Sequence, residues 1–98
     1  MNDKFVLDDQ GNPVLEPDLM KWSKWFEQSE KRVLARDDLG NIRVSTVFLG
    51  LDHSFGSGPP LLWETMIFGG KHDDYQKRYS TRDEALAGHR HAVWLASN

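Results

Sequence analysis

The amino-acid sequence predicts an α+β fold, in which an antiparallel β-meander of about four strands carries two helices packed on one face. Two observations support this fold class. Short β-rich segments follow one another between residues 32 and 79, and patterns typical of amphipathic helices lie before and after them. Because consecutive strands joined by short turns usually pair with each other, a meander is the simplest arrangement.

The first fifteen residues contain two short apolar runs, Lys4 to Leu7 and Pro13 to Leu15, separated by the turn-forming sequence DDQGN. We expect residues 1–15 to form a hairpin or a loosely held N-terminal arm. A helix is predicted for residues 17–29, because Pro17 suits a first helical turn and Leu19, Trp22 and Phe26 recur at helical spacing.

Strands are predicted for residues 32–36, 42–49, 61–68 and 75–79, with residues 37–41 as the loop of a hairpin. The last helix is predicted for residues 82–96, since Thr81 and Glu84 have the spacing of a capping box. Leu86 and Val93 on this helix are expected to share one core with Trp22, Phe26 and the central strands.

Composition narrows the class of protein. A chain of 98 residues fits one domain over residues 1–98. Its four tryptophans supply apolar surface that can be buried in a single core. The sequence lacks cysteine, which excludes disulfides and thiolate chemistry and favours the cytoplasm. It shows no leader or membrane-spanning pattern, and its net charge of −3 comes without a basic stripe, so we expect neither membrane nor direct nucleic-acid binding.

Histidine and carboxylate side chains offer one candidate catalytic set, Asp52, His53, Glu64 and His89. These residue types suit acid–base or metal-assisted chemistry. Adjacent residues of an extended chain point to opposite sides, however, and no further ligand lies at a recognised spacing. We therefore expect no catalytic residues, no metal site and no cofactor, with Asp52 bonding to the loop backbone and His89 satisfied within the core.

The irregular segment Gly50 to Pro60 is the longest loop, and it is either a partner-binding loop or a packed connector. The candidate binding residues in it are Asp52, His53 and Phe55. Two tryptophans complete the set, because Trp25 and Trp94 lie off the central stripes of their helices and tryptophan is enriched in interaction hot spots.

Three stretches carry a resemblance: RVSTVFLGLDHSFG at 43–56, GPPLLWETMIFGG at 58–70 and YSTRDEALAGH at 79–89. In these stretches the chain resembles a family of short proteins encoded by bacteriophage and prophage genomes. The resemblance implies an origin in a mobile element and implies no activity, cofactor or functional residue.

The function that follows is a non-enzymatic protein-binding accessory module of phage or prophage origin, which could inhibit a host or defence protein in the host cytoplasm. The alternatives are a small acid–base or metal-assisted enzyme that uses Asp52, His53, Glu64 and His89, and a structural homo-oligomer that self-associates through an exposed sheet face.

Overall fold

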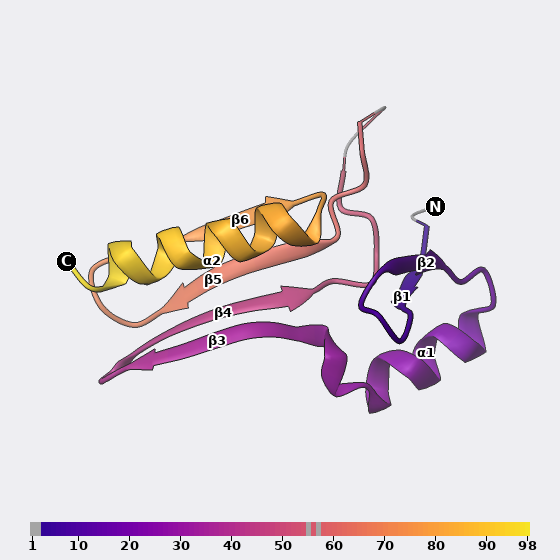
Figure 1. The fold of residues 1–98 in the computed structure, drawn as a ribbon, viewed down its shortest axis with the longest axis horizontal. Helices are drawn as coiled ribbons and strands as arrows, with labels where there is room; N and C mark the ends of the chain where they lie inside the picture. The colour runs from indigo at the N-terminus through magenta and orange to yellow at the C-terminus, as the bar shows by residue number, and fades with distance from the viewer. Residues whose placement is uncertain (1–2, 55, 57) are drawn as a thin grey trace.

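The main sheet has four antiparallel strands that follow one another in sequence order (Figure 1). The computed structural model describes residues 3–54, 56 and 58–98. The strands are β3 (Val33–Leu39), β4 (Ile42–Phe48), β5 (Trp63–Phe68) and β6 (Gln76–Tyr79). Helix α2 (Arg82–Ala96) packs on this sheet, which confirms the predicted α+β class and the four-stranded meander.

The turn between β3 and β4 is shorter than the predicted loop at residues 37–41. Asp37, Asp38 and Leu39 belong to β3, and Leu39 pairs with Ile42 across the turn. Gly40 has a φ of 64°, the positive value that a two-residue hairpin turn needs at its first central position. The loop prediction was wrong at these positions because partners on neighbouring elements offset the poor strand propensity of aspartate.

Helix α2 begins where the sequence predicts, at a capping box. Thr81 accepts the backbone N–H of Glu84 at 3.1 Å, and the Glu84 carboxylate accepts the Thr81 N–H at the same distance. The buried stripe of α2 consists of Ala85, His89 and Ala92. The expected core position of Leu86 was wrong, since this side chain is only half-buried beside that stripe.

The covered face of the sheet holds two apolar clusters. One gathers Phe48, Trp63, Tyr79 and Ala85 with Leu7 and Leu62, and the other gathers Val44, Ile67 and Ala92 with Val93 at its margin. Small residues on the buried stripe of α2 let the helix axis approach the sheet closely, so both clusters are sealed by one helix.

The N-terminal elements lie beyond one end of the sheet (Figure 1). They are the hairpin of β1 (Phe5–Leu7) and β2 (Pro13–Leu15), helix α1 (Leu19–Gln28) and the 3-10 turn η1 (Glu30–Arg32). Helix α1 starts after Asp18, whose carboxylate accepts the N–H groups of Met20 and Lys21, so Pro17 precedes the helix.

Helix α1 packs on β1 and reaches the sheet through its aromatic side chains, whereas the sequence predicted both helices on one face. Its Trp22 indole N–H donates to the carbonyls of Phe5 and Gly50, each at 3.1 Å. Trp22 and Phe26 also cover Gly50, which has a φ of 75° and leaves no room for a side chain. These aromatic residues therefore anchor the hairpin to the chain that leaves β4.

Gly88 fixes the distance between α2 and β6. A Cβ atom at this position would overlap the phenol ring of Tyr79, which is 6% exposed and part of the core. Gly88→Ala is expected to lower the free energy of unfolding by about 1–2 kcal/mol, because overpacking outweighs the gain of about 1 kcal/mol in helix propensity.

Thermal unfolding measures this change, and Gly58→Ala is the matched control. Gly58 has open space around it and no positive φ, so its alanine variant should unfold at the same temperature as the wild type or slightly above. A Gly88→Ala variant that is as stable as the Gly58→Ala variant would contradict the close approach of α2.

Candidate functional site

A chain of hydrogen bonds crosses the middle of the covered face. The His89 ring, on α2, is 4% exposed and contacts two strands. Its Nδ1 atom lies 2.7 Å from the Thr46 Oγ1 atom, and its Nε2 atom lies 2.8 Å from the Asp37 carboxylate. Thr46 in turn lies 2.5 Å from the Thr65 hydroxyl on β5. Helix α2 is thereby joined to three adjacent strands.

The acceptor character of Asp37 sets the direction of these bonds. An ionised carboxylate only accepts, so His89 Nε2–H donates to Asp37. In the neutral ring the Nδ1 atom then accepts the Thr46 hydroxyl proton, and Thr46 accepts from Thr65. Each of these buried polar groups has a partner, as buried groups generally require.

A hydroxyl, a histidine and a carboxylate are also the groups of a nucleophilic triad, but their accessibility here excludes that role. Thr46 and Thr65 are both 0% exposed, and Asp37 is the one member whose side chain reaches solvent. A nucleophile must touch its substrate. The arrangement therefore positions α2 on the sheet, as the expectation of a satisfied core histidine implies.

The candidate catalytic set Asp52, His53, Glu64 and His89 is not assembled. Glu64 pairs with Val47 on the sheet face opposite α2, where it accepts hydrogen bonds from Arg78 at 2.9 Å and Gln76 at 2.5 Å. His89 lies on the covered face. Since the sheet separates these two residues, the acid–base or metal-assisted enzyme built on this set lacks a common cavity.

Asp52 closes the base of the Gly50 to Pro60 loop. Its carboxylate accepts the backbone N–H groups of Ser54 at 2.8 Å and Leu61 at 3.0 Å. The hydrogen bond from Ser54 is the main cause that holds the pKa of Asp52 below its usual range. The backbone of His53 also donates to Leu61, at 3.1 Å. Asp52 therefore bonds to the loop backbone, as expected.

The other candidate binding residues differ in exposure. Trp25 is half-buried and makes an edge contact with Phe48, with ring centroids 5.9 Å apart, so it lies at the rim of the core. Trp94 is 61% exposed and stacks on His91. His53 is half-buried, and Phe55 lies outside the described residues.

The face of the sheet opposite α2 carries apolar residues that were not among the candidate binding residues predicted from the sequence. Neither helix covers it in the described part of the chain, and four apolar side chains run diagonally across it, namely Val33, Val47, Met66 and Phe68. Val33 is 53% exposed and Phe68 45%, while Val47 and Met66 between them are half-buried. The sequence did contain a signal for this face. In β4 the residues Arg43, Ser45 and Val47 alternate with the buried ones, and they change from polar to apolar along the strand.

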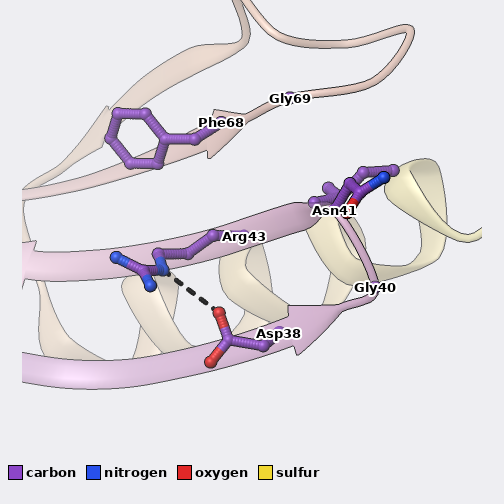
Figure 2. Close-up of a pocket in the computed structure, with 7 residues that line it drawn as sticks. Asp38, Gly40, Asn41, Arg43, Phe68 and Gly69 are labelled. Atoms are coloured by element: carbon purple, nitrogen blue, oxygen red, sulfur yellow. Dashed lines mark hydrogen bonds and ion pairs between the residues drawn. The ribbon is translucent and has the colours of Figure 1, made fainter.

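Charged residues flank this apolar diagonal. At one end of the sheet, Asp38 binds Arg43 at 3.1 Å and Arg36 at 3.3 Å. Figure 2 shows Asp38, Arg43 and Phe68 on neighbouring strands, at the edge of a shallow cavity of about 490 Å³ that extends to the Gly40–Asn41 turn. On the other side of the diagonal, Glu64 is paired with Arg78.

Among the residues that the structure describes, no three histidine or acidic side chains gather in a way that could hold a metal ion. No helix in the described ranges has the length and apolar character needed to cross a bilayer.

Comparison with known proteins returned no match to a family model, to a curated protein or to a solved structure.

The buried threonines provide a test of the His89 network. Thr46→Val removes the partner of both His89 Nδ1 and the Thr65 hydroxyl, and should lower the free energy of unfolding by about 1–3 kcal/mol. Thr65→Val, the matched control, leaves the Thr46–His89 bond intact and should cost less. Urea unfolding of both variants measures the difference, and equal losses would contradict the continuous network.

The pKa of Asp52 predicts a pH-dependent contribution to loop stability. Because the folded-state pKa is lowered, the ionised carboxylate stabilises the fold above the ordinary pKa of about 4, and this contribution is lost as pH falls below it. Asp52→Asn should therefore lower the melting temperature at pH 7, with the gap closing towards pH values of about 3. A gap that stays constant over this range would show that the charge has no part in closing the loop.

Proposed function

We propose that this protein is a non-enzymatic protein-binding module that uses the face of the sheet opposite α2. The observation that carries the proposal is the uncovered apolar diagonal of Val33, Val47, Met66 and Phe68. Antiparallel sheets often leave one face in water, but that face is then usually polar. An apolar stripe across such a face is a common mark of an interaction surface.

The residue types on this face support protein recognition. Phe68 gives an exposed aromatic ring at the C-terminal end of β5, and Arg36 and Arg43 lie near it with side chains about half exposed. Aromatic residues and arginine are enriched in binding hot spots. The positive charges of Arg36 and Arg43 are already partly balanced by Asp38. A partner with an apolar patch and a carboxylate at its rim would match this surface.

The biological setting is proposed from the resemblance to short bacteriophage and prophage proteins in the stretches at 43–56, 58–70 and 79–89. An accessory protein of this kind acts in the cytoplasm of the host. Binding without chemistry is enough to inhibit a host or defence protein, because occupation of a functional surface blocks it.

The same face also supports a second candidate, a structural homo-oligomer. Two copies can bury the apolar diagonal against each other, as sheets do when they pack face to face. The oligomeric state therefore has to be measured together with partner binding.

Replacing Phe68 tests both candidates. Phe68→Ser should weaken association with the partner at least about tenfold, since the loss of a hot-spot side chain costs more than about 1–2 kcal/mol. Capture from host lysate identifies the partner, and titration with the purified partner measures the affinity. Leu19→Ser, which changes an exposed apolar residue on α1, away from this face, is the matched control.

Light scattering on the same samples separates the two candidates. A monomeric wild type whose partner binding depends on Phe68 supports the binding module. A wild-type dimer that Phe68→Ser dissociates supports the homo-oligomer instead. Unchanged affinity and unchanged mass in a folded Phe68→Ser variant would overturn both uses of this face.

A further inference from the structure

We propose that the groove between β6 and α2 is a second interaction surface, which binds an extended acidic peptide segment as a fifth strand of the sheet. This groove lies on the edge of the sheet, away from the apolar diagonal. The proposal is therefore independent of the binding face described above.

The groove exists because α2 presents small residues to the last strand. It is a cavity of about 450 Å³ lined by Tyr79 and Ser80 on the sheet side and by Ala87, Gly88 and His91 on the helix side. The absence of a side chain on Gly88 lets the Tyr79 ring form its floor. Figure 1 shows α2 in front of β6, with which it is in contact.

The backbone of β6 is available for pairing along the groove. As the last strand in the sheet order, β6 has one side without a neighbouring strand. The Ile67 N–H donates to the Tyr75 carbonyl at 3.3 Å, which places the odd-numbered positions of this strand towards β5. In an antiparallel ladder the intervening residues, Gln76 and Arg78, then direct their N–H and C=O groups outward. Such groups are a template for an added strand.

The charges at the groove favour an acidic ligand. The Lys77 ammonium lies over the Tyr79 ring, 5.9 Å from its centroid, and His91 faces the groove from α2. The one acidic residue that lines the groove, Glu84, already accepts hydrogen bonds from the N–H and hydroxyl of Thr81. Arg78 also lines the groove, and its guanidinium is paired with Glu64 at 2.9 Å.

An aromatic surface continues the groove along α2. The Trp94 ring stacks on His91, with centroids 5.9 Å apart, and most of its surface is in solvent. One helical turn separates the two residues, so a strand lying on β6 could place an apolar side chain against Trp94 and an acidic one against Lys77. This arrangement gives Trp94, singled out from the sequence, a defined role.

Peptide selection tests the proposal without knowledge of the natural partner. A displayed library of linear random 12-residue peptides is panned against the immobilised wild-type protein and, in parallel, against Lys77→Glu. We expect acidic sequences with alternating apolar residues to be enriched on the wild type and to bind Lys77→Glu at least tenfold more weakly. Lys71→Glu changes an exposed lysine outside the groove, so this control should bind as the wild type does.

The mode of binding is tested with one enriched peptide made synthetically. The backbone amides of the peptide form two alternating sets, and only one set can bond to β6. N-methylation of that set should abolish binding. The amide NMR signals of Gln76, Arg78 and Gly88 should shift on titration. Failure to enrich acidic peptides, equal binding to Lys77→Glu, or tolerance of N-methylation on both sets of amides would overturn the proposal. Phe68→Ser should bind the peptide normally. A negative result for the groove can therefore be told apart from a negative result for the face of the sheet opposite α2.

Discussion

The buried hydrogen bonds of His89 organise the rest of the structure. Thr46 and Thr65 pair directly across β4 and β5, and they lie between the cluster that contains Phe48 and Trp63 and the cluster that contains Val44 and Ile67. An apolar stripe alone would allow α2 to slide along the sheet, whereas a polar group with two fixed partners has one satisfied position. The histidine therefore defines the register of α2.

This register has consequences for both surfaces of the sheet. With α2 centred on β4 and β5, its small residues Ala85 and Ala92 seal the two clusters, and Gly88 meets Tyr79. The other helix is held at the end of the sheet by the contacts of Trp22 and Phe26 with Gly50. One helix can cover only one face, so neither helix covers the diagonal, and Val33 and Phe68 at its ends stay exposed.

The long loop after β4 shows that residues of the types used in catalysis can have a purely structural role. Asp52 and His53 look like catalytic residues in the sequence, but the Asp52 carboxylate is occupied by two backbone N–H groups. Glu64, the third member, is neutralised by Arg78. Charged groups that are paired within the fold contribute rigidity, and the exposed Phe68, Trp94 and Lys77 are the residues on which the proposed binding surfaces rest.

The sequence by itself determined the features that depend on local interactions. The capping box at Thr81 and Glu84, the helical spacing from Arg82 to Ala96 and the order of the strands follow from neighbours along the chain. Only the tertiary structure decided that Asp37 lies in a strand, that Glu64 and His89 occupy opposite faces, and that α1 leaves the sheet uncovered. Those outcomes depend on contacts between residues up to 52 positions apart, such as His89 with Asp37. Local propensity and spacing carry no information about such long-range partners.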